Sequence, residues 1–148
     1  MATEFDSVLG LLCEHEVDFI VVGGVACVLN GFVRATQALA ILVRVTPENI
    51  DRLFAALSNW GEGFVRELER ADFDLIPGAV RLVEDFPLDM FTLLAGKTYD
   101  DFCAVARTTE DGLKYLPPAA LIETKQGSVR EKDRIDIAAL RRILHQES

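Results

Sequence analysis

The segment Ile20-Val21-Val22-Gly23-Gly24 joins an apolar run to two consecutive glycines. The run predicts a buried strand, and Val25 to Leu29 predicts a short helix directly after it. Glycine lets the backbone approach a ligand closely, and a helix start presents free N–H groups and the positive end of its dipole. The segment therefore predicts a place that can hold a phosphate group. A turn of this kind can also serve packing alone, which is the alternative interpretation.

A single aspartate, Asp89, interrupts the apolar segment 88–91. A carboxylate inside an apolar strand costs free energy unless it is paired or coordinates a metal ion. We therefore interpret Asp89 as a functional carboxylate. The alternatives are a structural hydrogen-bonding role and a position at the end of the strand.

The hydrophobic pattern predicts the elements that position these residues. Helices are expected over residues 3–15, 25–29, 47–57, 64–71, 99–106, 118–126 and 130–145, and extended segments over 18–22, 38–45, 79–84, 88–94 and 113–116. Thr46 and Pro47 are expected to start the third of these helices. In the last helix, the residues expected to face the core are Ile135, Ala139, Leu140 and Ile143. This order predicts an α/β or α+β fold, with one domain over residues 1–148 and a small mixed β-sheet flanked by helices.

The composition excludes several classes of protein. Fifteen basic and 24 acidic residues give a net charge of -9, which argues against sequence-blind nucleic-acid binding but allows a local basic patch. The apolar stretches are far shorter than the roughly 20 residues that span a membrane, so no membrane association is expected. Three widely separated cysteines fit neither a disulfide framework nor a zinc site. We expect them to be reduced and buried in a cytoplasmic protein.

The run Val22-Gly23-Gly24 resembles the opening motif of the nucleotidyltransferase superfamily related to DNA polymerase beta. In that motif a hydrophobic residue and Gly-Gly or Gly-Ser precede, after a short gap, two acidic residues that alternate with hydrophobic ones on a strand. The thirteen residues between Gly24 and Ala38 fit that gap. Gly31, Arg34, Ala35 and Thr36 are similar to the Gly-x-x-Arg-Ala-Thr approach of AbiEii-type toxins.

Alanine occupies both positions at which this resemblance predicts aspartate, Ala38 and Ala40. In the family these two carboxylates point to one face of the strand and hold divalent metal ions that bind the triphosphate. The resemblance thus implies an Mg²⁺-dependent parent enzyme and predicts that the chain as it stands is inactive. Two origins are open: replacement of parental aspartates, which the retained Gly23-Gly24, Arg34 and Lys125 favour, and natural degeneracy.

The resemblance extends over roughly residues 17–145. It implies that Asp89 supplies the third metal-binding carboxylate and that Lys125, on a late helix, contacts nucleotide phosphate. It also implies that Gly23, Gly24, Arg34 and Thr36 bind the nucleotide. The segment 130–136 is similar to the Lys-Asp-x-x-Asp segment that opens the family's last helix. Its aspartates, Asp133 and Asp136, are expected to favour the helix start or to pair with Lys125.

The function implied is transfer of a nucleoside monophosphate from an NTP to an acceptor hydroxyl, with attack on the α-phosphate and release of pyrophosphate. The toxin-like motif implies an RNA 3′ end, such as that of tRNA, as acceptor and a cognate antitoxin as partner. The acidic charge of the chain favours a small cationic acceptor, such as an aminoglycoside. The alternative that is not an enzyme is a catalytically inactive module that binds a nucleotide or a partner.

Overall fold

The computed structural model describes residues 4–126 and 130–147. A six-stranded mixed sheet, in the order β3-β4-β2-β1-β6-β5, forms its centre. The strands are β1 (Phe19–Val22), β2 (Leu39–Val43), β3 (Ala79–Val83), β4 (Pro87–Phe91), β5 (Arg107–Thr108) and β6 (Lys114–Tyr115). The β2–β4 and β1–β6 pairs are parallel, and the other neighbouring strands are antiparallel. The predicted α/β class with a small mixed sheet is confirmed.

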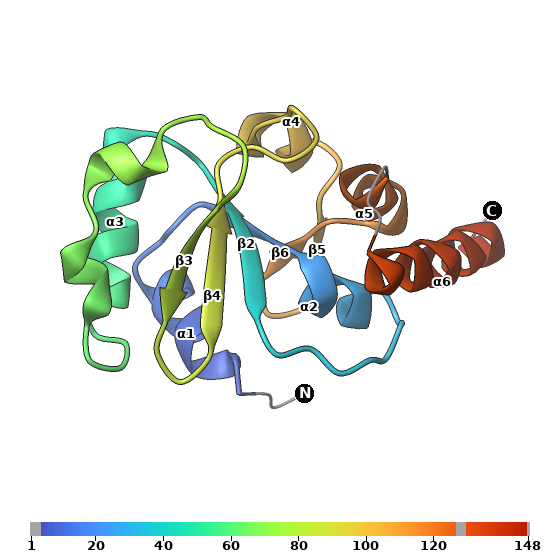
Figure 1. Ribbon diagram of the computed structural model, residues 1–148, viewed down its shortest axis with the longest axis horizontal. Helices are drawn as coiled ribbons and strands as arrows, with labels where there is room; N and C mark the ends of the chain where they lie inside the picture. Colours follow the sequence, from blue (N-terminus) through green and yellow to red (C-terminus); the bar gives the residue numbers. More distant parts are fainter. Residues whose placement is uncertain (1–3, 127–129, 148) are drawn as a thin grey trace.

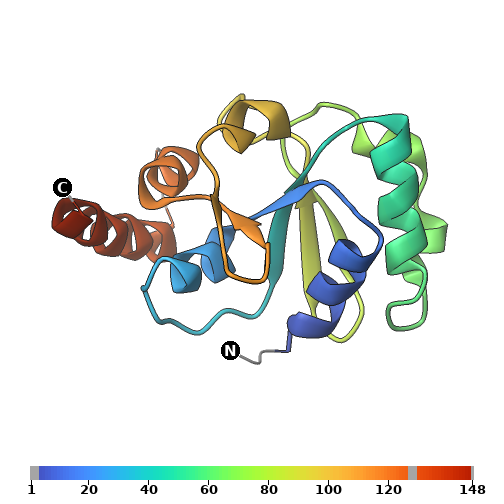
Figure 2. The ribbon, with the colours of Figure 1, turned by 180° about the vertical axis from the view of Figure 1, so that it is seen from behind.

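Helices flank this sheet at both ends. They are α1 (Asp6–Glu14), α2 (Gly23–Leu29), α3 (Pro47–Leu57), α4 (Tyr99–Cys103), α5 (Pro118–Lys125) and α6 (Glu131–Glu147). Figure 1 shows α3 at one end of the molecule and α5 with α6 at the other, where α6 projects outward. The view from behind in Figure 2 shows the same arrangement, with α1 beside α3. None of the helices in the described residues is long and apolar enough to cross a bilayer.

The strands β1 and β2 are the apolar centre of the fold. All four residues of β1 are buried, and in β2 only Ala40 keeps partial exposure. A central strand whose two faces are both covered typically has a continuous apolar sequence. The sequences of β1 and β2 have this pattern. Helix α2 follows β1 without a loop and packs against both strands. The turn between β1 and α2 is therefore fixed relative to β2.

The start of α3 has the predicted cap. The Thr46 hydroxyl accepts a hydrogen bond from the backbone N–H of Asn49 at 3.1 Å, and Pro47 takes the first helical position. Both features satisfy or remove N–H groups that a helix start leaves without partners. The residues Ile50, Leu53 and Leu57 then face the core, as their spacing predicts.

Several predicted boundaries were wrong. Helix α2 begins at Gly23, so the two glycines form its first turn, and β2 begins at Leu39 instead of Ala38. Helix α1 begins at Asp6, and Thr3 lies outside the described residues. The segment 64–71 forms two short 3-10 turns, Phe64–Glu67 and Arg70–Phe73, and the two-residue strand β5 was not predicted. The three cysteines are free, but only Cys27 is buried. Cys13 is exposed and Cys103 is half-buried, so the expectation that all three are buried was wrong for these two.

The core face predicted for α6 was confirmed at Leu140, met only in part at Ala139 and Ile143, which are half-buried, and wrong at Ile135. Ile135 is 54% exposed, whereas Asp136 is 1% exposed and Leu140 is fully buried. The helix is therefore rotated so that carboxylates meet its neighbours. The physical reason is that α5 and the loop before β2 present Lys125 and Arg34 to this face, and buried cations require carboxylate partners.

Candidate functional site

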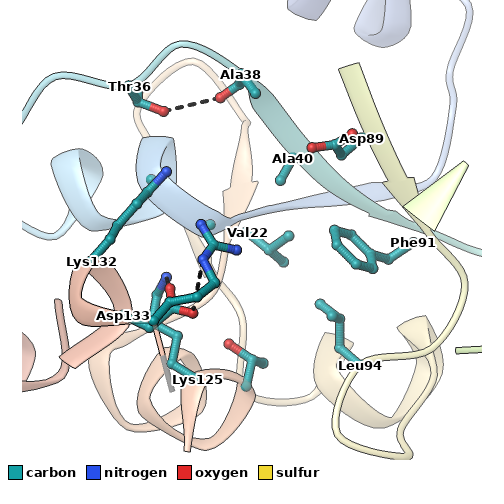
Figure 3. A pocket seen from close by; sticks show the side chains of 14 residues that line it. Val22, Thr36, Ala38, Ala40, Asp89, Phe91, Leu94, Lys125, Lys132 and Asp133 are labelled. Carbon is teal, nitrogen blue, oxygen red and sulfur yellow. Dashed lines mark hydrogen bonds and ion pairs between the residues drawn. The ribbon is translucent and has the colours of Figure 1, made fainter. Parts of the chain in front are cut away.

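A cavity of about 250 Å³ opens between the sheet and the helices α5 and α6. Figure 3 looks into it: strands lie on one side, and side chains from α5 and the start of α6 lie on the other. Most of the residues that the sequence singled out line this cavity, namely Gly23, Gly24, Thr36, Ala38, Ala40, Asp89 and Lys125. These residues come from four separate segments of the chain, namely 23–24, 36–40, 89 and 125, so the fold brings together residues that are far apart in the sequence.

The sheet wall of the cavity consists of Ala38, Ala40 and Asp89. Ala40 and Asp89 are register partners on the parallel strands β2 and β4. Ala38 lies directly before β2, two residues from Ala40, and lines the cavity with it. The three positions at which the resemblance predicts carboxylates are therefore adjacent, and Asp89 is the one that carries a carboxylate.

Both oxygens of the Asp89 carboxylate accept hydrogen bonds from Arg81, its cross-strand partner on β3. Arg81 Nε donates to Oδ1 at 2.7 Å, and Nη2 donates to Oδ2 at 3.0 Å. This bond raises the pKa of Arg81. The Asp89 side chain is 17% exposed, so the paired guanidinium neutralises a carboxylate that is largely removed from water. Asp89 thus has the structural hydrogen-bonding role that was the alternative interpretation.

The two glycines at the start of α2 permit close contact with β2 and with the loop before it. Gly23 has φ +64°, and a Cβ atom added there would lie 3.0 Å from the Cβ of Ala40. A Cβ atom on Gly24 would lie 2.7 Å from the hydroxyl oxygen of Thr36. The Thr36 hydroxyl in turn donates to the Ala38 carbonyl at 3.1 Å, as Figure 3 shows. Packing therefore requires both glycines, and their role toward a phosphate stays a prediction.

On the opposite side of the cavity, four charged side chains form an ion-pair network, of which Lys125 and Asp133 line the cavity and Arg34 and Asp136 lie behind it. Lys125 Nζ lies 3.2 Å from Asp133 Oδ1 and 2.9 Å from Asp136 Oδ2. The same Asp136 oxygen accepts a hydrogen bond from Arg34 Nη1 at 2.9 Å. All four side chains are at most 14% exposed. The predicted pairing of Asp133 and Asp136 with Lys125 is confirmed, and the network joins α5, α6 and the loop before β2.

Arg34 is the predicted nucleotide-binding residue that the structure does not place at the cavity surface. Its guanidinium is directed to Asp136, so it supports the cavity from behind. Lys125 keeps both positions, because it lines the cavity and belongs to the network. Lys125 is therefore not a lysine on the solvent-exposed face of a helix.

Three cations at this site were missed by the sequence analysis as individual residues: Arg81, Arg130 and Lys132. Arg130 and Lys132 line the cavity from the start of α6 and, with Lys125 and Asp133, form its helical wall. The available signal was the density of charge in the segment 130–136. For Arg81 no local signal exists, because its contact with Asp89 depends on the register between β3 and β4.

Lys132 lies in a positive environment. Burial is the larger cause that lowers its pKa, and the nearby cations Arg34, Arg130 and Lys125 lower it further. Among the hydrogen bonds and ion pairs of the described residues, none involves Lys132, whereas Lys125 has two carboxylate partners. Figure 3 shows the Lys132 side chain extending along the cavity toward Thr36. The site therefore has an ammonium group to which an anion could bind.

The residues present do not fit the Mg²⁺ ion that the resemblance implies. Magnesium needs oxygen ligands at short distance, and the sheet wall offers two methyl groups and a carboxylate held by Arg81. Within the part of the chain that the structure describes, no three His, Cys, Asp or Glu side chains gather closely enough to hold a metal ion. The second carboxylate of the cavity, Asp133, is engaged by Lys125.

The arrangement can hold an anionic group beside a neutral surface. The cations of the helical wall face the sheet wall, whose methyl groups add no charge. Comparison of the chain with protein-family models gives no match, and comparison with curated protein sequences gives none either.

Proposed function

We propose that the chain is a nucleotide-binding protein of the nucleotidyltransferase pattern, without transfer activity as its sequence stands. One observation carries this proposal. Ala40 and Asp89 are register partners, Ala38 lines the same cavity, and Lys125 faces them from α5. The expected positions of three carboxylates and one phosphate-binding lysine are thus gathered around a single cavity.

The loss of transfer follows from the side chains of the sheet wall. In the parent reaction that the resemblance implies, paired carboxylates would hold divalent metal ions, which would stabilise the negative charge of the reacting triphosphate. The methyl groups of Ala38 and Ala40 cannot replace such carboxylates. The cavity, its glycines and its lysine do not depend on them, so binding and chemistry are separable in this chain.

The charge around the cavity supports an anionic ligand. Although the chain carries a net charge of -9, the helical wall presents Lys125, Arg130 and Lys132 with a single carboxylate, Asp133. A nucleoside triphosphate fits this local charge. A cationic aminoglycoside is attracted by the acidic remainder of the chain, not by this wall.

The test restores the two carboxylates. The double variant Ala38→Asp/Ala40→Asp should gain Mg²⁺-dependent incorporation of labelled NTP into an acceptor, measured first with total tRNA. The unchanged chain should bind NTP and transfer none. The matched control is Ala38→Asn/Ala40→Asn, which adds side chains of the same size without charge and should stay inactive.

Two outcomes would contradict the proposal. Failure of both the unchanged chain and the double aspartate variant to bind any NTP in calorimetry would remove nucleotide binding as the function. Transfer by the asparagine control would show that the reaction does not require carboxylates at positions 38 and 40. Binding by the aspartate variant without transfer to tRNA would keep the function and exclude tRNA as its acceptor.

A further inference from the structure

The cavity lacks the groups that make nucleotide binding depend on a metal ion. Its sheet wall has alanine at 38 and 40, and Arg81 engages both oxygens of Asp89. A metal ion that arrived with a triphosphate would find no free carboxylate pair on this wall. It would therefore add positive charge to the cavity without gaining ligands there.

The local charge of the cavity is positive once existing pairs are counted. Three cations line it, Lys125, Arg130 and Lys132, with two carboxylates, Asp89 and Asp133. Asp89 is neutralised by Arg81, which comes from outside the lining. Asp133 lies 3.2 Å from Lys125 and 3.8 Å from Arg130. The surplus positive charge includes that of Lys132, which takes part in none of the hydrogen bonds and ion pairs of the described residues.

We propose that the cavity binds the phosphate groups of a nucleoside triphosphate in its metal-free form, and that Mg²⁺ weakens this binding instead of assisting it. This inference rests on the proposed function, because it concerns the same cavity and the same class of ligand. The Lys132 ammonium supplies the attraction. Arg81 keeps the Asp89 carboxylate from repelling the phosphates.

The direction of the effect follows from charge. Complex formation with Mg²⁺ cancels two negative charges of the triphosphate. Each lost contact between unit charges at about 4 Å in water is worth roughly a fivefold change in affinity, and more where the contact is partly shielded from solvent. We therefore expect ATP to bind about five- to thirtyfold more tightly in EDTA than in excess Mg²⁺.

The experiment is calorimetric titration of ATP into the full chain, in EDTA and in excess Mg²⁺, at matched ionic strength. The outcomes separate the two proposals. Tighter binding in EDTA supports the inference. Equal affinity, or tighter binding with Mg²⁺, overturns it and leaves nucleotide binding intact. Absence of binding under both conditions overturns the proposed function itself.

Two variants locate the effect. Lys132→Gln should weaken ATP binding in EDTA about fivefold or more. Its control is Lys97→Gln, an equal loss of charge on a lysine that pairs with Glu123 outside the cavity, and this variant should bind as the unchanged chain does. Equal losses in both variants would mean that only the net charge matters, which would overturn the role of Lys132.

Arg81→Gln tests the neutralisation of Asp89. Arg81 is largely exposed, so this change should leave the fold intact, as circular dichroism would verify. It should weaken ATP binding in EDTA and reduce the difference between EDTA and Mg²⁺, because the Asp89 carboxylate then faces the phosphates unpaired. Unchanged binding would overturn this part of the inference.

Discussion

The two sides of the cavity satisfy their charges in opposite ways. On the sheet wall, two of three positions carry methyl groups, and Asp89 is paired with an arginine that is 58% exposed. On the helical side, Lys125 and Asp133 of the wall contact Asp136 and Arg34 behind it, and all four side chains have little access to water. One side has almost no charge left, while the other keeps a complete buried network.

The difference indicates that the shape of the cavity and its chemistry depend on separate residues. The network connects α5, α6 and the loop before β2, so it holds the helical wall against that loop. Its charges compensate one another without the sheet wall. The cavity can therefore persist although alanines occupy positions 38 and 40.

Breaking the network should have the largest effect on stability. Asp136 is 1% exposed and pairs with both Arg34 and Lys125. The variant Asp136→Asn keeps the size of the side chain but removes the carboxylate that Arg34 and Lys125 share, so that Lys125 keeps Asp133 alone and the buried Arg34 loses its ion pair. We expect it to lower the free energy of unfolding by about 3–5 kcal/mol, measured by urea denaturation.

The control for this variant is Asp100→Asn, which also removes one carboxylate from an arginine. Asp100 pairs with Arg44 but is 67% exposed, so its loss should cost less than about 1 kcal/mol. Equal effects of the two substitutions would contradict the distinction between the buried network and the surface pairs.

Gly23 belongs to the sheet side of the cavity, because it directly follows β1 and faces Ala40. The variant Gly23→Ala places a side chain in a left-handed conformation, which costs about 1–2 kcal/mol, and brings its Cβ to 3.0 Å from that of Ala40. We expect a loss of about 2 kcal/mol or more in thermal or chemical unfolding.

Gly10→Ala is the matched control, since a Cβ atom on Gly10 meets nothing within 4 Å in helix α1. Alanine should raise the free energy of unfolding there by up to about 1 kcal/mol. A destabilised Gly10→Ala variant, or a neutral Gly23→Ala variant, would contradict the contact argument.

The sequence predicted the elements that depend on local pattern. The apolar runs of β1 and β2 and the cap of α3 were correct because each reflects burial or hydrogen bonding within a few residues. The gathering of Gly23, Ala40 and Asp89 came from the resemblance, not from the pattern itself. Their contacts depend on strand order, which local periodicity does not contain.

The orientation of α6 could not be predicted for a physical reason. Its apolar residues suggest that Ile135 faces the core, yet Asp136 does so because Arg34 pairs with it from 102 residues earlier in the chain. The pairing of Arg81 with Asp89 likewise depends on the register between β3 and β4. Which carboxylates are buried depends on the cations that lie next to them in the folded structure. A single sequence does not show which residues become neighbours in this way.

Restoring charge to the sheet wall should have a smaller effect than breaking the network. Without a metal ion, Ala38→Asp/Ala40→Asp places two carboxylates next to Asp89, and like charges at this spacing repel by about 1 kcal/mol. We expect a lower melting temperature than that of the unchanged chain, with recovery in Mg²⁺ for this variant alone. A double aspartate variant that is clearly more stable without metal would refute the repulsion argument.

The smallest effect concerns the far end of α6, where the same helix carries an exposed pair instead of a buried one. Arg107 donates to both oxygens of Glu147, at 2.8 and 3.1 Å, and this contact lowers the pKa of Glu147. Because the folded pKa is depressed, the pair stabilises the helix end above the ordinary glutamate pKa, about 4.3, and loses this effect as the pH falls through the folded value.

Amide hydrogen exchange in the last turn of α6 should therefore accelerate below this pH, relative to the first turn, after correction for the intrinsic exchange rate. Glu147→Gln should remove that pH dependence and leave the first turn, held by Asp133 and Asp136, unchanged. An NMR titration of the Glu147 carboxyl carbon reports the pKa directly. A midpoint at or above the ordinary value would show that Arg107 does not hold the helix end in solution, and that α6 is fixed by its buried charges alone.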